Sequence, residues 1–301
     1  SIIGFILIFG ILVWIIYNNQ PTQKEIEAEQ AKKELVKQEE STTKIADEAP
    51  FTATIDSTST DTLQIAKLKS SLGNFAYSAT LPSAKNEVTT LENDFLLLKI
   101  ANKGGYIVEA TLKNYTKFSK NSGHLVSLIK DNNSDLNIQF QTNDNRTLNT
   151  KDLYFEPTLT KVGENQILSM QLKAGPNEFL EFKYVLKPND YMLDFEVQSQ
   201  GLNKVLNTSK PMDLEWKMKT YRTEKSISYE NRYTVADYKY EDDKFSYVSD
   251  GTAKEDTPID VSYVSFKQHF FTSILLTDKP FKKSVIHSDN LVKDEEKDTI
   301  F

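Results

Sequence analysis

Side chains that could carry chemistry are few in this chain, and their spacing does not fit a catalytic or metal site. The three histidines, His124, His269 and His287, show no metal-ligand pattern. A glycosidase would need two carboxylates about 5 to 10 Å apart across a cleft. Adjacent acids point to opposite faces of a strand or are solvated in a loop. We therefore expect no catalytic role for the acidic runs, which are Glu241-Asp242-Asp243, Glu255-Asp256 and Asp294-Glu295-Glu296.

Signatures of the common enzyme classes are also missing from the 301 residues. H-E-x-x-H, G-x-S-x-G, G-x-x-x-x-G-K-S/T and G-x-G-x-x-G do not occur. The chain has no cysteine, which excludes disulfides, thiolate zinc sites, iron–sulfur clusters and thiol catalysis. The net charge is −7 and the basic residues are scattered, so nucleic-acid binding is not expected. The sequence predicts a protein without an enzymatic reaction, a catalytic residue, a cofactor or a metal.

The N-terminal segment, residues 1–19, has the composition of a membrane anchor. The residues from Ile2 to Tyr17 are uncharged and almost all apolar, and Trp14 and Tyr17 lie where an aromatic belt would form. No pair of small residues follows in Asn18-Asn19-Gln20-Pro21, so a signal-peptidase site is not expected. We predict an uncleaved transmembrane helix.

Residues 20–86 are predicted to form a tether. Strong helix formers with Glu and Lys three or four apart fill residues 22–40, but too few large apolar residues occur there to form a core-facing stripe. Residues 41–62 are crowded with Ser and Thr and contain Pro50, which is linker composition. We therefore expect a charged helical spacer followed by a flexible linker.

Residues 87–301 have the texture of an all-β domain. Short runs of aromatic, β-branched and Leu residues are separated by Asn, Asp, Gly and Pro. The Pro-Asn-Asp turn at Lys187-Pro188-Asn189-Asp190 predicts one hairpin, and the adjacent glycines of Asn102-Lys103-Gly104-Gly105 predict another. No long helical pattern interrupts these runs, so we expect an antiparallel sandwich. The predicted strands are Phe95–Ile100, Tyr106–Leu112, Leu125–Ile129, Leu136–Phe140, Ile167–Leu172, Glu178–Leu186, Tyr191–Gln198, Met212–Met218, Val261–Phe266 and Phe271–Leu276.

A cluster of tyrosines lies among acids and lysines between Tyr221 and Tyr247. Amphipathic rings on half-exposed strands account for such a cluster, and a surface groove is the functional alternative. The groove aromatics would be Tyr229, Tyr233, Tyr238 and Tyr240.

Three groups of residues resemble segments of one known family. Leu91-Glu92-Asn93-Asp94, Asn102-Lys103-Gly104-Gly105 and Leu112-Lys113-Asn114-Tyr115 resemble the opening of the periplasmic domain in the YidC/Oxa family of membrane protein insertases. Phe266-Lys267-Gln268-His269-Phe270-Phe271 is similar to a late segment of that domain. The start, from Ile3-Gly4-Phe5 to Asn19-Gln20-Pro21, is similar to the family's first transmembrane helix. The groups occur in the family's order and span nearly the whole chain.

The resemblance implies a periplasmic antiparallel β-supersandwich, and an inner-membrane protein with residues after about 20 in the periplasm. It implies insertion and folding of inner-membrane proteins, alone or with the Sec translocon. The expected partners are Sec translocon components, nascent inner-membrane proteins and the lipid bilayer. The family's insertion core follows this domain and has no counterpart among these residues, so we expect a β-domain truncated at its C-terminal end. The family-like interaction patch would comprise Phe266, Lys267, Gln268, Phe270 and Phe271.

Two other functions stay open from the sequence. Supersandwich folds resemble those of aldose epimerases and sugar-binding domains, which makes a membrane-tethered carbohydrate-binding module the main alternative, with the tyrosine cluster as its stacking platform. A sugar epimerase would need an acid and a base facing each other across a groove, with His124 or His269 supplying one of them.

Overall fold

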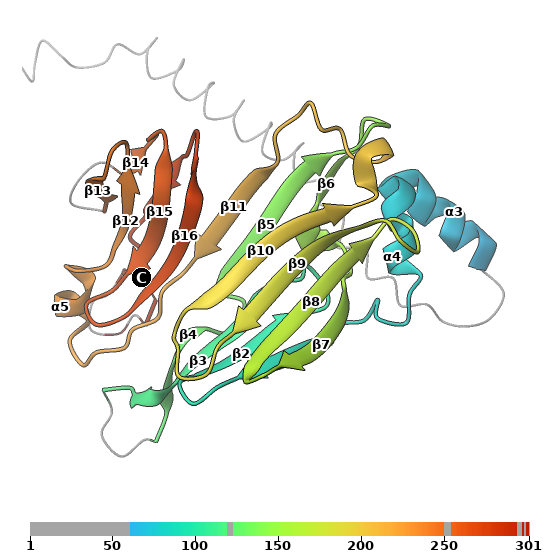
Figure 1. Cartoon of the computed structure of the whole chain (residues 1–301). Helices are drawn as coiled ribbons and strands as arrows, with labels where there is room; N and C mark the ends of the chain where they lie inside the picture. The colour runs from blue at the N-terminus through green and yellow to red at the C-terminus, as the bar shows by residue number, and fades with distance from the viewer. Residues whose placement is uncertain (1–60, 119–122, 250–253, 294–296, 298, 301) are drawn as a thin grey trace, which may run out of the picture. The chain divides into compact units, whose positions relative to one another are not determined.

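The structure, a computed structural model, describes residues 61–118, 123–249, 254–293, 297 and 299–300 (Figure 1). The predicted membrane anchor, the predicted spacer helix and most of the Ser/Thr-rich linker lie outside the described residues. No helix in the described ranges combines the length and the apolar character needed to cross a membrane. The described residues are mainly β, in antiparallel sheets with a sandwich-like arrangement, as the sequence predicted.

Three antiparallel sheets form the first and larger part of the described residues. One has the strand order β1-β2-β3-β4, the second β10-β9-β8-β7 and the third β11-β5-β6. Figure 1 shows the β7–β10 sheet lying across the sheet of β2, β3 and β4, in two layers. The strands are β1 Val88–Glu92, β2 Leu96–Ala101, β3 Ile107–Thr116, β4 Leu125–Ile129, β5 Ser134–Gln141, β6 Thr147–Asn149, β7 Glu156–Val162, β8 Asn165–Lys173, β9 Phe179–Leu186, β10 Leu193–Gln200 and β11 Asp213–Met218.

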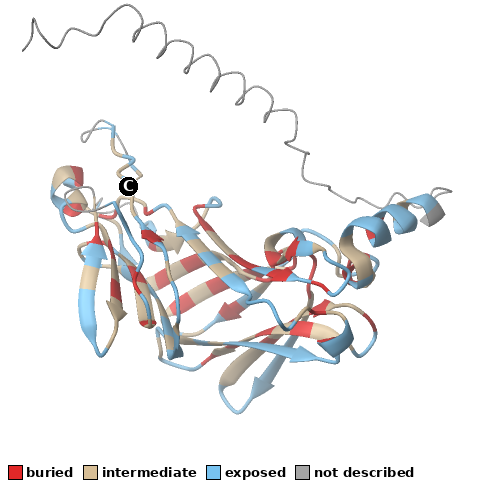
Figure 2. Ribbon diagram, turned by 90° about the horizontal axis from the view of Figure 1, so that it is seen from above, coloured by how far each residue is buried: buried red, intermediate tan, exposed pale blue. Residues whose placement is uncertain are grey.

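Alternation of side chains builds the main core between these sheets. Every second residue is buried in β2, in β9 and, from Leu168 to Leu172, in β8, because successive side chains of a strand point to opposite faces. Figure 2 shows this as red segments alternating along the inner strands. The core is apolar, and its members include Leu98, Ile100, Leu168, Met170, Leu180 and Phe182.

Both predicted hairpins are present. Strands β9 and β10 pair in the register Leu186↔Leu193 across the Lys187–Asp190 turn, where Asn189 has a φ of 51°. Strands β2 and β3 pair across the Asn102–Gly105 turn. Gly105 has a φ of +68°, and a Cβ placed there would lie 3.0 Å from the ring of Phe155. Glycine therefore satisfies both the backbone conformation and the space at this turn.

Short helices precede β1 and join the same core. They are α3 Asp61–Leu72, the 3-10 helix Gly73–Phe75 and α4 Ala76–Ala79. Phe75 is fully buried against Phe140, and Ser78 Oγ donates a hydrogen bond to the carbonyl of Tyr154. The folded unit thus begins before residue 87, within the segment predicted as tether. Two more 3-10 helices, Thr150–Asp152 and Leu202–Lys204, lie in loops of the sandwich.

A separate sheet with the order β13-β12-β15-β16 follows α5. Its own small core surrounds Tyr238, Val248 and Val261. β14 and β17 form a two-stranded ribbon beside it, and Ile300 makes an isolated bridge to Tyr221. The elements are α5 Ile227–Asn231, β12 Val235–Tyr240, β13 Lys244–Val248, β14 Glu255–Asp256, β15 Val261–Lys267, β16 Thr272–Phe281 and β17 Ile286–His287.

Candidate functional site

A large open groove lies where the sandwich meets strand β16. Its volume is about 960 Å³, which falls in the range of sites that bind a small molecule. Its floor comes from β2, β3 and the turn before β10, and β16 and the residues before α5 form its other side. The side chains that line it include Leu98, Ile107, Leu112, Tyr115, Phe118, Leu128, Leu136, Tyr184, Tyr191, Met192, Phe195, Trp216, Thr223, Phe270, Phe271 and Ile274.

The groove is apolar, and several of its rim residues are exposed aromatics. Among the described residues that line it, only Glu224 and Lys225 have charged side chains. Phe270 is 69% exposed, Tyr115 45% and Tyr191 41%. The rings of Tyr115 and Tyr191 lie 6.4 Å apart between centroids. An apolar surface of this kind left open to water is typical of a binding site.

One side of the groove is the edge of a sheet. In the part of the chain that the structure describes, β16 pairs with β15 and with no other strand. Four consecutive residues of β16, Thr272 to Leu275, line the groove. Because successive side chains alternate between the two faces of a strand, a groove that meets four in a row runs along the strand's edge. Unpaired backbone N–H and C=O groups therefore border the groove.

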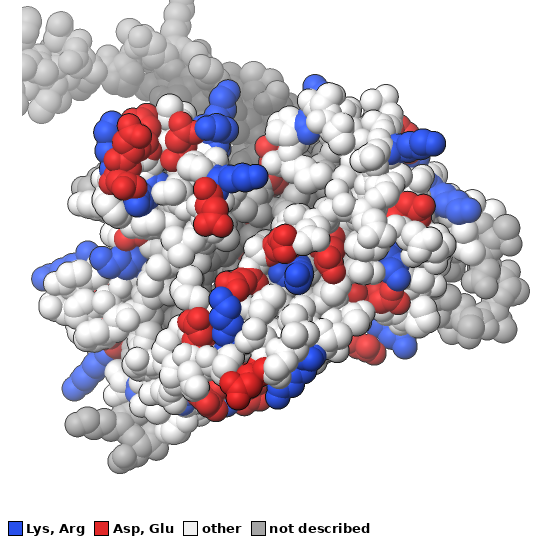
Figure 3. All heavy atoms as spheres, viewed as in Figure 1, with Lys and Arg blue, Asp and Glu red and all other residues white. Residues whose placement is uncertain are grey.

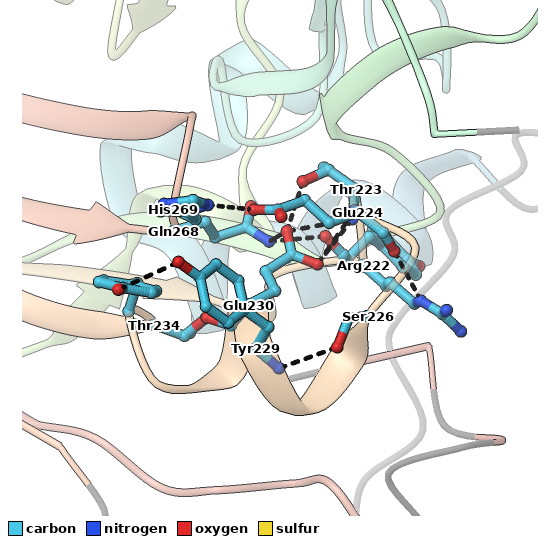
Figure 4. A network of polar contacts seen from close by, with 11 residues as sticks. Arg222, Thr223, Glu224, Ser226, Tyr229, Glu230, Thr234, Gln268 and His269 are labelled. Carbon is cyan, nitrogen blue, oxygen red and sulfur yellow. Dashed lines mark hydrogen bonds and ion pairs between the residues drawn. The ribbon is translucent and has the colours of Figure 1, made fainter. Parts of the chain in front are cut away.

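A buried carboxylate holds the loop beside the groove (Figure 4). Glu230 on α5 is fully buried. It accepts hydrogen bonds from the amide of Thr223 at 3.0 Å, from the hydroxyl of Thr223 and from the amide of Glu224 at 3.2 Å. Gln268 Nε2 donates to Glu230 at 3.0 Å and to the Tyr221 carbonyl at 2.7 Å. The network ties the loop before α5 to the turn between β15 and β16.

A ring cluster covers the outer side of this network. His269 Nδ1 lies 2.7 Å from Glu224 Oε1. The His269 ring stacks on Tyr233 at 4.4 Å between centroids and contacts Tyr229 and Phe270 at 5.2 and 4.2 Å. The imidazole of His269 and the carboxylate of Glu224 are in direct contact within this cluster. A sugar epimerase would instead need an acid and a base that face each other across a groove.

The five residues nominated as a family-like patch divide between two environments. Phe270 and Phe271 line the groove, and Phe271 meets Tyr115 edge to face at 5.4 Å. Gln268 is buried in the polar network, whereas Lys267 is exposed. Phe266 packs against Trp216, with ring centroids 4.4 Å apart. Phe266 and Gln268 therefore make structural contacts inside the fold, whereas Phe270 and Phe271 form part of the groove wall. The role of the segment as an interaction patch stays a prediction.

The four nominated tyrosines do not gather on one surface. Tyr238 is fully buried in the core of the β12–β16 sheet, and Tyr240 packs against the same core. Tyr229 and Tyr233 are half-exposed and belong to the ring cluster around His269. The groove is lined by other aromatic residues. Sequence reasoning nominated Phe270 and Phe271 of the β15–β16 turn through the resemblance, but it missed the aromatics of β3, the β9–β10 hairpin and β11, which are distant from one another in the chain.

The other titratable groups considered in the sequence lie apart from the groove. His124 is exposed, and His287 lies 3.7 Å from the exposed Glu255. Glu241, Asp242 and Asp243 form the β12–β13 turn with positive φ angles, and residues 294–296 lie outside the described residues. Within the described residues no group of three or more His, Asp or Glu side chains is arranged to hold a metal ion.

Comparison with known proteins finds matches that cover most of the chain. The model of the family "YidC periplasmic domain" matches residues 88–299. Proteins named membrane protein insertase YidC are similar to this chain: 30% identical in Parabacteroides distasonis over 96% of the chain, 30% in Porphyromonas gingivalis over 94%, and 28% in Phocaeicola vulgatus over 96%. The chain spans 45%, 44% and 44% of these relatives' lengths. The chain belongs to the YidC family of membrane protein insertases, and residues 88–299 are its periplasmic domain.

Proposed function

We propose that this chain is the N-terminal and periplasmic part of an insertase that inserts and folds proteins of the bacterial inner membrane. In this proposal residues 1–19 anchor the chain, and residues after about 20 lie in the periplasm. The step that moves a polar segment into lipid occurs in a part of the protein outside these residues. No bond is made or broken, because insertion requires only a lower cost of moving polar groups through the bilayer.

The observation that carries the proposal is the apolar groove with a strand edge along it. A client segment that has left the ribosome or the translocon exposes apolar side chains and unpaired backbone groups. An extended segment laid against β16 would form backbone hydrogen bonds with the strand edge, and its alternate side chains would enter the groove. Backbone pairing is independent of the client's sequence, and apolar contacts tolerate many side chains. Both properties suit a protein that handles many clients.

We further propose that the domain works both alone and beside the Sec translocon. The exposed aromatics around the groove supply a surface on which a second protein could pack, and Phe270 is the most exposed of them. The support for this step is family membership together with an open groove.

Site-specific photocrosslinking in the full-length protein tests the proposal. A photoreactive phenylalanine analogue would replace Ile274 in the groove or, as a control, Leu159, which is 48% exposed on β7 and outside the groove. Inner-membrane proteins stalled on ribosomes at increasing chain lengths would then be added to membranes that carry either variant.

The expected result is a crosslink from position 274 that appears when an apolar segment emerges and disappears after its insertion. Position 159 should give no such crosslink. Equal crosslinking from both positions, or none from position 274 with clients that depend on the protein, would contradict the proposed role of the groove. Crosslinks between position 270 and translocon components would test the Sec partnership separately.

A further inference from the structure

A group of basic side chains lies at the end of the groove formed by the β3–β4 hairpin and the loop before α5. We call it the basic corner, and it comprises Lys117, Lys130, Arg222 and Lys225. The amide of Phe118 donates to the carbonyl of Thr223 at 3.2 Å, which joins the hairpin to the loop. In Figure 3, blue side chains project at the left edge of the molecule, where Figure 1 places α5.

The cations of the basic corner lie on aromatic rings. The Arg222 guanidinium carbon lies 4.8 Å from the ring centroid of Phe118, and Lys130 Nζ lies 4.6 Å from that of Tyr221. Arg222 Nε donates to the carbonyl of Glu224 at 2.8 Å, and its Nη2 donates to the carbonyl of Lys225. The guanidinium is therefore held by backbone carbonyls and a ring, and these contacts leave its charge uncompensated.

Like charges are kept close together in this corner. Lys130 and Lys117 repel each other, and burial together with this repulsion holds the pKa of Lys117 below its usual range. Lys130 lies 3.6 Å from the carboxylate of Asp131, which is largely exposed. Among the residues that the structure describes, no carboxylate forms an ion pair with Lys117 or Arg222. The corner therefore has an excess of positive charge that an anionic partner would neutralise.

Exposed apolar side chains accompany this charge. Phe118 is 43% exposed and lies under Arg222, and Tyr115 and Phe270 are exposed on the adjoining groove rim. Cations beside exposed aromatic rings are the composition that binds the interface of an anionic membrane. The rings enter the headgroup region, and each Lys or Arg is attracted by the surface charge. An acidic peptide would use the charges but would leave the rings exposed to water.

We infer that the basic corner docks this domain onto anionic lipid headgroups and so holds the end of the groove against the membrane surface. The inference is independent of what the groove binds. It commits to a bilayer surface as the partner, and it predicts a dependence on lipid charge and on salt concentration.

The absence of cysteine from the chain makes a direct test available. A single cysteine at Asn114, exposed on the same hairpin, would carry an environment-sensitive dye in the full 301-residue chain. The control position is Thr208, exposed in the loop at the opposite end of β11 from Arg222. Each protein would be reconstituted into nanodiscs of phosphatidylcholine, with or without phosphatidylglycerol, containing lipids that carry a nitroxide on the headgroup.

The nitroxide should quench the dye at position 114 in nanodiscs that contain phosphatidylglycerol, and high salt should relieve the quenching. The dye at position 208 should stay unquenched. Lys117→Glu with Lys130→Glu should lower the docked-to-undocked ratio by about tenfold or more. Lys161→Glu with Lys204→Glu, two exposed lysines elsewhere, makes the same change in net charge and should leave the ratio unchanged.

Thermal unfolding of each variant identifies any that fail to fold, and Lys117→Gln with Arg222→Gln is a milder second pair. Three results would overturn the inference. They are equal quenching with and without anionic lipid, quenching unaffected by either substitution pair in the corner, and binding of a soluble polyglutamate peptide without any quenching by anionic nanodiscs. The last result would assign the corner to acidic polypeptides.

Discussion

Gln268 Nε2 donates a hydrogen bond to Glu230 Oε1 at 3.0 Å, and both side chains are buried. The pair joins the β15–β16 turn to α5 across 38 residues of sequence. This hydrogen bond fixes the position of the turn that carries Phe270 relative to the loop that carries Arg222. The stability of the polar network therefore controls the geometry of the groove rim.

Replacing Glu230 with Ala should destabilise the fold. The substitution leaves the buried amide of Thr223 and one of the two side-chain N–H groups of Gln268 without an acceptor, and each unsatisfied group costs about 1 to 3 kcal/mol. We expect a loss of at least about 2 kcal/mol in the free energy of unfolding, measured by urea titration. Glu196→Ala, which removes an exposed carboxylate 3.8 Å from Lys183, should change it by less than about 0.5 kcal/mol. Similar losses in the two variants would show that the network does not hold the loop.

The turn at Gly105 offers a second stability test. Gly105→Ala forces a Cβ into a left-handed backbone conformation and to within 3.0 Å of the Phe155 ring. Gly163 has a φ of +62° with open space around its added Cβ, so Gly163→Ala imposes only the backbone cost of about 1 kcal/mol. We expect Gly105→Ala to cost about 1 to 3 kcal/mol more, from overpacking. Equal melting temperatures for the two variants would mean that the core near Phe155 yields to the extra methyl group.

Local patterns predicted the fold well where strands alternate and turns contain Gly, Pro or Asn. The β9–β10 hairpin is the clearest case, because Phe179–Leu186 alternates along its length and a Pro-Asn-Asp turn follows it. β7, Glu156–Val162, was not predicted, since it is an edge strand whose residues are mostly exposed and mostly polar. The helix α3, Asp61–Leu72, was also missed, because the prediction placed residues 20–86 in the tether.

The candidate site was less accessible to sequence reasoning than the fold. Phe270 and Phe271 were nominated through a resemblance, and both line the groove. Tyr238 was nominated through its type and neighbours, yet it fills a core. Glu230 carried no local signal, because its partners Thr223 and Gln268 lie seven and 38 residues away. Pairing between distant segments decides which aromatics and acids meet, and composition does not encode that pairing.

The edge of β16 should lose client binding when a charge is placed in the groove. Ile274→Lys puts an ammonium into an apolar wall and discourages a further strand from pairing there. We expect crosslinking of client segments to a photoreactive residue at position 270 to fall several-fold. Leu276→Lys makes the same change two residues along the strand at a residue that does not line the groove, and it should leave crosslinking intact. A loss of crosslinking in both variants would indicate a change in the sheet instead.

Lys117 should reduce stability while it supports membrane docking. Its pKa is lowered by burial and by Lys130, so folding favours the neutral form of this amine and the charged form is destabilising. Stability from this group should therefore rise with pH as the lysine loses its proton at alkaline pH. Lys117→Gln removes the repulsion and should raise the free energy of unfolding at neutral pH by up to about 0.5 kcal/mol, since the site is partly solvated. Lys161→Gln, at an exposed position, should leave it unchanged. Because the same Lys117→Gln variant should dock more weakly on anionic nanodiscs, a gain in stability with undiminished docking would assign the docking to the other cations of the basic corner.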